Sequence, residues 1–397
     1  MVGTPRTQPI ARAARSALAL LGSGVLGAAG LVLLARGWLP GIAADVGSTL
    51  VLFIQWEVMM LTAAKFGVDQ LVFALVTADA RRRPQLWPHI ARRTIPIALV
   101  TGVAMASVFG PVAALAGVVA TVADTHAVCR MAELSGRRRL REFSVGNILN
   151  YPLFFLLIAV GPWEGRISLE AAAWCFCVSS LARWAWVASR APAPEATEPY
   201  QVAAPAALGT QQVLNYVAFR GDQLVLPLIS FALFAEATTV GRSEYVYLAR
   251  FPELVAAVLV TLAPLYLPSA YRTCWSHRAS ERHRGKVTLL AVALAVMVGG
   301  VAFRAMGATA SAPVLLAMFI AAAALGLPAN LVTYALMREE RLDRLTRALV
   351  FGVLAGGAVA GCSVLAHQVI VLAAAVPAAL ATYVVLGWHS VTGSTAA

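Results

Sequence analysis

The stretch LNYVAFRGDQLVLPL, residues 214–228, places an arginine and an aspartate two positions apart inside a segment that is otherwise apolar enough for lipid. An ionisable side chain at the bilayer centre costs between about 2.5 and 17 kcal/mol, so such a residue normally faces protein or a water-filled cavity. Arg220 and Asp222 therefore indicate a membrane helix that turns part of its surface toward an enclosed polar interior.

The composition of the whole chain points the same way. It is 60% hydrophobic and 13% charged, whereas soluble domains carry roughly 25% charged residues. A bilayer core accommodates about 20 apolar residues per helix, which predicts an all-α integral membrane protein with about twelve spans. The predicted spans are 16–35, 46–77, 94–109, 112–133, 145–162, 169–188, 206–234, 239–270, 287–303, 310–337, 348–367 and 369–388.

The basic residues follow a topological pattern. Every second connection between predicted spans is basic, including the runs 81–83 and 137–139 and the pair Arg183 and Arg190. The remaining connections hold only Arg36, Arg166 and Arg304. This positive-inside pattern predicts an inner-membrane protein with both termini cytoplasmic. It explains the net charge of +12 without nucleic acid, and it makes anionic lipids expected partners.

The chain divides into two halves of six predicted spans. A proline-rich cytoplasmic linker, residues 191–205, separates a lobe of residues 1–190 from a lobe of residues 206–397. Because six is even, both halves enter the membrane from the same side, as parallel repeats around a central cavity do. The segment 352–361, GVLAGGAVAG, has the G-x-x-x-G spacing that favours close helix contact.

Polar residues on the seventh span define two faces. Gln211, Asn215 and Asp222 fall within about 40° of one another on a helix, whereas Arg220 projects from nearly the opposite side. A bend at Gly221 is the one feature that would bring Arg220 and Asp222 together. We therefore expect the two charged residues to serve different contacts.

Buried charge also marks the second span. Lys65 and Asp69 are four residues apart and can pair on one helix face, with Glu57 within about 80° of Lys65. Two interpretations stay open for this pair: a functional group facing a substrate route, or an ion pair that only closes helix packing.

The fourth and eighth spans carry further candidates. Asp124 lies on the fourth span beside His126, whose imidazole could shuttle protons. Arg250 and Glu253 lie on the eighth span around Pro252, which is expected to kink the helix. For these residues, too, an ion pair that closes packing is the alternative to a role in transport.

Two stretches resemble a known family. The first, RGDQLVLPLISFALFAEATTVGRSEYVYLARFPELVAAVLVTLAPLYLPS (220–269), resembles the second half of oligosaccharide and polysaccharide exporters of the MOP superfamily. The second, FGVDQLVFALVTADA (66–80), is similar to the second span of that family. The positions that carry the first resemblance are Asp222, Leu224, Leu226, Val240, Gly241, Tyr245 and Pro268.

That resemblance implies two lobes that face a cavity open alternately to either side, and a cargo that is a polyprenyl-pyrophosphate-linked glycan. Polysaccharide-assembly proteins would be its protein partners. In a flippase of this kind, Lys65, Arg220 and Arg250, with Gln211 and Asn215, would line the route, because guanidinium groups bind phosphate oxygens bidentately. The expected residues for gating, or for binding a coupling H⁺ or Na⁺, are Glu57, Asp69, Asp124, Asp222 and Glu253.

Other functions are weighed against the flippase. A cation-coupled drug antiporter of the same fold would use the carboxylates against a cationic substrate. A major-facilitator transporter is also six plus six, but TADARRRPQL (77–86) lacks the glycines usual in its loop motif. A membrane glycosyltransferase or polymerase would need larger outer loops, so we expect no enzyme. No cofactor or metal motif is found.

Overall fold

The computed structural model describes residues 26–27, 29–34, 37–39, 41–161, 167–190, 197–202, 206–232, 245–246, 248–249, 312–338, 341–366 and 369–392. Within these residues the chain is helical apart from one two-stranded sheet. Seven helical stretches of the described part are long and apolar enough to cross a membrane, which confirms the all-helical membrane fold class. Most of the first, eighth and ninth predicted spans lies outside the described residues, so the count of twelve stays a prediction.

The first half of the chain forms one helical layer, and the second half forms another. The N-terminal lobe contains α2 (Ala44–Lys65), α3 (Val68–Ala78), β1 (Arg82–Gln85), α4 (Trp87–His89), the π-helical η1 (Ile90–Thr94), α5 (Ile95–Phe109), α6 (Pro111–Gly136), α7 (Leu140–Ile148), α8 (Tyr151–Val160) and α9 (Leu169–Ala188). The linker contains β2 (Glu198–Gln201), and the C-terminal lobe contains α10 (Ala206–Ala232), α14 (Ala312–Arg338), α15 (Leu342–Ala366), α16 (Val369–Ala373) and α17 (Ala375–Thr392).

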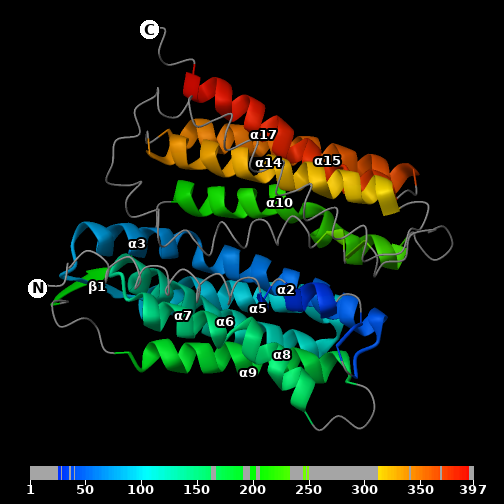
Figure 1. Cartoon of the computed structure of the whole chain (residues 1–397). Helices are drawn as coiled ribbons and strands as arrows, with labels where there is room; N and C mark the ends of the chain where they lie inside the picture. Colours follow the sequence, from blue (N-terminus) through cyan, green and yellow to red (C-terminus); the bar gives the residue numbers. More distant parts are fainter. Residues whose placement is uncertain are drawn as a thin grey trace, which may run out of the picture.

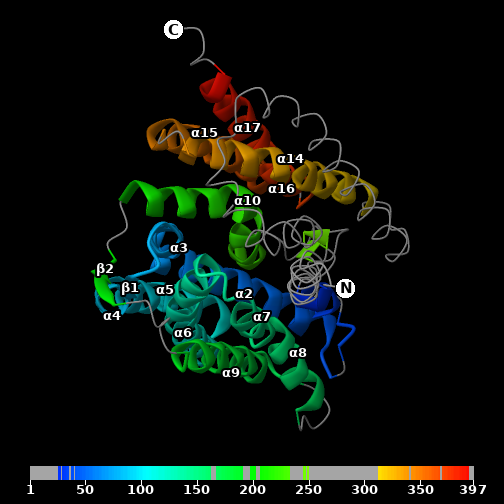
Figure 2. The same ribbon diagram turned by 60° about the vertical axis from the view of Figure 1, so that its left-hand side comes forward.

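The two layers meet along α2 and α10. Figures 1 and 2 show α14, α15 and α17 on one side of α10, and α5 to α9 on the far side of α2. Within the N-terminal lobe, α6 packs against α2, α3, α5 and α9. Phe53 on α2 meets the rings of Phe109 and Phe176 edge to face, at centroid distances of 5.7 and 6.4 Å. Helix α6 is thus the centre of this lobe, and α2 connects its core to the other lobe.

Close packing in the C-terminal lobe follows the glycine spacing. A Cβ atom placed on Gly352 would lie 2.8 Å from the carbonyl oxygen of Ala379, and one on Gly356 would lie 3.0 Å from that of Ala375. Both carbonyls belong to α17, so the prediction of close helix contact is confirmed for Gly352 and Gly356, whereas an added Cβ on Gly357 or Gly361 meets nothing within 4 Å. Small residues allow the backbones of α15 and α17 to approach each other.

The second predicted span, 46–77, is wrong as a single helix. Helix α2 ends at Lys65, and the chain passes through Phe66 (φ 45°) and Gly67 (φ 83°) before α3 begins at Val68. Left-handed backbone of this kind interrupts a right-handed helix and suits glycine, which has no Cβ atom. Lys65 thereby occupies the last turn of α2 and Asp69 the first turn of α3, where each charge complements its helix dipole.

Two other spans also consist of more than one helix. The predicted span 145–162 is α7 followed by α8, with the interruption at Leu149 and Asn150 just before Pro152. The predicted span 369–388 is α16 followed by α17, which are separated at Ala374. Proline cannot donate the backbone hydrogen bond that a continuous helix requires, so breaks precede it readily. The predicted span 169–188 agrees with α9 in full.

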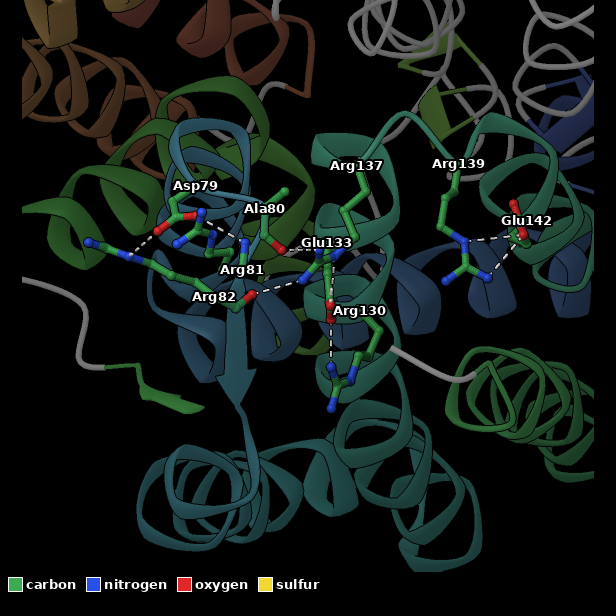
Figure 3. A network of polar contacts seen from close by, with 9 residues as sticks. All are labelled: Asp79, Ala80, Arg81, Arg82, Arg130, Glu133, Arg137, Arg139 and Glu142. Carbon is green, nitrogen blue, oxygen red and sulfur yellow. Dashed lines mark hydrogen bonds and ion pairs between the residues drawn. The ribbon is translucent and has the colours of Figure 1, made fainter. Parts of the chain in front are cut away.

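The interlobe linker is attached to the N-terminal lobe by a parallel strand pair. Strand β2 pairs with β1 in the register Arg82 with Glu198 through Gln85 with Gln201. Strand β1 is in turn held by Arg137, at the end of α6, which donates to the backbone oxygens of Ala80 and Arg82 and to the carboxylate of Glu133. Figure 3 shows Arg137 between Glu133 and the backbone of Ala80 and Arg82.

Candidate functional site

One face of α10 carries polar side chains toward the N-terminal lobe. Gln212, Tyr216 and Arg220 are spaced four residues apart, so they form a single row along the helix. Each of them hydrogen-bonds to α2 or to residues at the α2–α3 break. We call this row and its partners the lobe seam. The row covers α10 from Gln212 to Arg220, a rise of about 12 Å at 1.5 Å per residue.

The deep end of the lobe seam is organised by Gln55 on α2, a residue that is 1% exposed. The Tyr216 hydroxyl donates to the Gln55 backbone oxygen over 2.7 Å, and Arg220 Nη1 donates to Gln55 Oε1. The expectation that Arg220 faces away from Asp222 and reaches across the lobes agrees with this geometry. Gln55 was missed in the sequence, where its signal is an amide within the apolar run VLFIQ at 51–55.

The other end of the seam is organised by Gln212. Its Nε2 donates to Asp69 Oδ1 over 3.1 Å, and its Oε1 accepts from the Gly67 backbone N–H over 3.1 Å. Lys65 Nζ lies 2.7 Å from Asp69 Oδ2, which confirms that these two residues pair. The amide therefore binds both groups that the α2–α3 break exposes: a helix-start N–H and a first-turn carboxylate.

At this end of the seam, the Phe66 ring packs into the space left by Gly209, which we call the notch. A Cβ atom on Gly209 would lie 2.1 Å from Cδ1 of Phe66, so the Phe66 ring occupies the space that any other residue at 209 would fill. The Arg93 guanidinium lies over the same ring, 4.5 Å from its centroid, within the range of cation–π attraction. Neither Phe66 nor Gly209 was singled out in the sequence, because the contact depends on the helix break.

We expect Gly209→Ala to force the Phe66 ring out of its notch and to lower the free energy of unfolding by about 1–3 kcal/mol, the usual cost of overpacking. Thermal unfolding of the purified protein in detergent measures this. Gly357→Ala on α15 is the matched control, since nothing lies within 4 Å of its added Cβ. Adding Phe66→Ala should recover part of the loss. Equal stability of the Gly209→Ala and wild-type proteins would contradict the notch.

The opposite face of α10 serves the C-terminal lobe. Gln211 Nε2 donates to the backbone oxygen of Leu342 over 3.0 Å and to Thr346 Oγ1 over 3.3 Å. Asp222, 1% exposed, accepts a 2.7 Å hydrogen bond from the Tyr245 hydroxyl. Asn215 Oδ1 is buried without a hydrogen-bond partner among the described residues. Gln211 and Asp222 thus share one face of α10, as predicted, and both contact the C-terminal lobe.

Asp222 also borders a cavity of about 160 Å³ inside the C-terminal lobe. Its walls come from α10, α15 and α17 and are otherwise made of small apolar residues such as Gly356, Ala375 and Ala379. This cavity lies within one lobe, whereas the predicted central cavity lies between the two lobes.

A buried charged cluster lies in the N-terminal lobe. Asp124 on α6 accepts from Ser180 Oγ over 2.7 Å and from Arg183 Nη1 over 3.4 Å, both on α9. Glu57 on α2 accepts from Thr121 Oγ1 over 3.4 Å. The exposed fractions of Glu57, Asp124 and Arg183 are 1, 2 and 7%. The prediction that Arg183 belongs to a basic connection is therefore wrong: it lies inside α9 and neutralises Asp124.

The remaining candidates are placed as follows. His126 lies near Trp87 and Trp184, with ring centroids 5.6 and 6.5 Å away, and thus joins an aromatic group. Arg250 and Glu253 lie outside the described residues, and their roles stay predictions. The structure brings Glu57 and Asp124 together, and it places Lys65 with Asp69. It keeps Arg220 and Asp222 on separate faces.

Comparison with known proteins shows what the fold resembles. No protein-family profile and no curated protein matches the chain. One similar solved structure is a MATE protein in complex with MaL6, with a TM-score of 0.61 and 11% identity over 97% of this chain and 98% of that chain. A second is an outward-facing multidrug resistance MATE family transporter of the MOP superfamily, with a TM-score of 0.60 and 12% identity over 96% of each chain. A third is a MOP superfamily transporter from Pyrococcus furiosus described as having a binding pocket of reverse polarity, with a TM-score of 0.51 and 12% identity over 97% of this chain and 95% of that chain. The chain therefore has the two-lobed fold of MATE and other MOP superfamily transporters.

Proposed function

We propose that the chain is an alternating-access exporter that carries a lipid-linked oligosaccharide across the cytoplasmic membrane. The observation that carries this proposal is the bond between Arg220 and Gln55, which joins the two lobes at the deep end of the seam. A partly buried arginine at a lobe interface suits a headgroup that bears phosphate oxygens, because the guanidinium presents several donors in a fixed fork.

The seam can open at a moderate cost. Its interlobe hydrogen bonds involve Gln212 with Asp69 and Gly67, and Tyr216 and Arg220 with Gln55. At about 0.5–1.5 kcal/mol net for each of the two neutral bonds and about 1.5–3 kcal/mol for each bond to Asp69 or Arg220, they contribute about 4–9 kcal/mol in total. A ligand with a differential affinity of about 5.5 kcal/mol can move a two-state equilibrium from 1:99 to 99:1. Cargo or a coupling ion could therefore drive the lobes apart.

The charged residues then divide into three roles. Arg220 binds the anionic headgroup when the seam opens. Lys65 and Asp69 act as part of the gate, since they bind each other and, through Gln212, the other lobe. Glu57 and Asp124 are the coupling groups: Arg183 pairs with Asp124, whereas Glu57 accepts a hydrogen bond from Thr121, so the cluster can take up one further positive charge.

A second candidate function is a cation-coupled antiporter for an organic cation. The observation that favours it is the same pair of buried carboxylates, Glu57 and Asp124. In such an antiporter, these carboxylates would bind the coupling ion and the cationic substrate in turn. One similar structure is described as a multidrug resistance MATE family transporter.

Reconstitution into liposomes tests the two candidates together. The purified chain is given either a fluorescent undecaprenyl-pyrophosphate oligosaccharide or ethidium with an imposed pH gradient. We expect the glycolipid to reach the opposite leaflet faster than in protein-free vesicles, as measured with a membrane-impermeant quencher. Ethidium movement without glycolipid movement would favour the antiporter, and movement of neither would overturn the exporter proposal.

A further inference from the structure

We propose that strand β2 is a strap that limits how far the N-terminal end of α10 can move from the N-terminal lobe, and that β2 must separate from β1 for the lobes to part widely at this end. The inference rests on the proposed alternating access, because it concerns the extent of that opening. The linker would thereby regulate how far the lobe seam opens.

The strap is hydrogen-bonded to the N-terminal lobe along its whole length. Four residues of β2 pair in register with β1, and the Glu198 backbone N–H donates to the Arg81 oxygen over 3.0 Å. Arg82 places its guanidinium 5.4 Å from the centre of the Tyr200 ring. Val202, 8% exposed, ends the strap by packing among Leu86, Ile90 and Cys129. Residues 198–202 of the linker therefore belong to the N-terminal lobe.

The strand that receives the strap is itself anchored in that lobe. The side chain of Arg137 is 2% exposed and contacts the Glu133 carboxylate over 3.1 Å. Its two terminal nitrogens donate to the backbone oxygens of Ala80 and Arg82, directly before and inside β1 (Figure 3). Since Arg137 ends α6, the helix at the centre of the lobe, β1 cannot shift without disturbing that helix end.

Chain length then sets the limit. Only residues 203–205 separate Val202 from Ala206, the first residue of α10. Four Cα-to-Cα steps of 3.8 Å span at most about 15 Å, little more than the 10–12 Å diameter of one helix. With β2 in place, Ala206 stays within this distance of Val202, and Gln212, six residues further along α10, lies at most about 9 Å beyond it. A wider opening requires either a longer connection or release of β2.

The readout is the labelling rate of a cysteine at a position that the closed seam partly covers. Leu208→Cys is suitable, because Leu208 packs against Gly67 across the seam. Cys274 and Cys362 are replaced by serine, since Cys362 is exposed and Cys274 lies outside the described residues, whereas Cys129, Cys175 and Cys177 are buried. The labelling rate with a bulky, membrane-impermeant maleimide is measured on the full chain in liposomes.

Two variants release the strap in different ways. One inserts Gly-Ser-Gly-Ser after Val202 and leaves β2 intact, and the other replaces residues 198–201 with Gly-Ser-Gly-Ser. We expect both to label roughly tenfold faster than the parent, because a longer or untied connection lets the two ends separate. The matched control replaces residues 192–195, which precede the strand, with the same four residues and should label at the parent rate.

Gln212→Ala separates a failed strap from a failed alternating-access proposal, since it breaks the seam without touching the linker. Faster labelling in Gln212→Ala but parent rates in both strap variants would overturn the strap alone. Parent rates in all three variants would overturn the opening of the seam, and the strap with it.

Discussion

Arg220→Ala should reduce export at least about 100-fold while leaving the chain inserted and folded. Hydrogen bonds to charged groups contribute about 1.5–3 kcal/mol each, and loss of a bidentate pair to phosphate removes two of them. Loss of the bond to Gln55 should cost stability much less, because the amide can turn toward Tyr216, whose hydroxyl lies 3.2 Å from Gln55 Oε1. The measurement is glycolipid translocation in liposomes, with thermal unfolding as the check on folding.

Two controls make this prediction specific. Arg220→Lys keeps the charge but loses the planar fork, so we expect intermediate export. Arg347→Ala removes an arginine whose side chain is 76% exposed and whose partner is Asp343, and it should export normally. Near-normal export by Arg220→Ala would assign Arg220 to helix packing and would remove the main support for an anionic cargo.

Asp124→Ala should lower the free energy of unfolding by about 3–5 kcal/mol, the usual cost of removing one partner from a buried ion pair. The change leaves the guanidinium of Arg183 and the hydroxyl of Ser180 buried without the oxygens that they now bind. Asp343→Ala is the matched control: this pair is 76% and 63% exposed, so solvent screening limits its contribution to about 0–1 kcal/mol. Thermal or denaturant unfolding in detergent measures both variants.

A double variant tests the cause of that loss. Asp124→Ala with Arg183→Met removes both charges, and replacing a buried pair by apolar side chains is often close to neutral, so most of the stability should return. A double variant as unstable as Asp124→Ala alone would show that the loss comes from the cavity left by the side chain. If Asp124→Ala lost no more stability than the exposed control Asp343→Ala, the cluster would no longer be a candidate for the coupling role.

Much of the architecture could be predicted from local pattern. The length and apolar character of α9 and α10 follow from residues within each segment, because a bilayer imposes one length scale on every span. The division of α10 into two polar faces also follows from helical geometry, which placed Arg220 opposite Asp222 before any partner was known. The glycines at 352 and 356 indicated close packing for the same local reason.

The partners and interruptions required the tertiary structure. Gln55 is one amide among apolar residues, and its importance arises only because α10 brings Tyr216 and Arg220 to it. Arg183 has the charge of a loop residue, and only the position of Asp124 on the neighbouring helix makes it a buried counter-ion. The break at Phe66 is stabilised by Gln212 and Gly209, which lie about 140 residues away.

The sequence by itself determined that this chain has the character of a membrane protein, where a span such as α9 runs and which faces of α10 are polar, because these properties depend on periodicity within about twenty residues. The tertiary structure alone decided which polar faces meet, where helices break and that the linker is attached to the first lobe. Those outcomes depend on hydrogen bonds and packing between distant segments, where one donor can satisfy many different acceptors until the fold selects one.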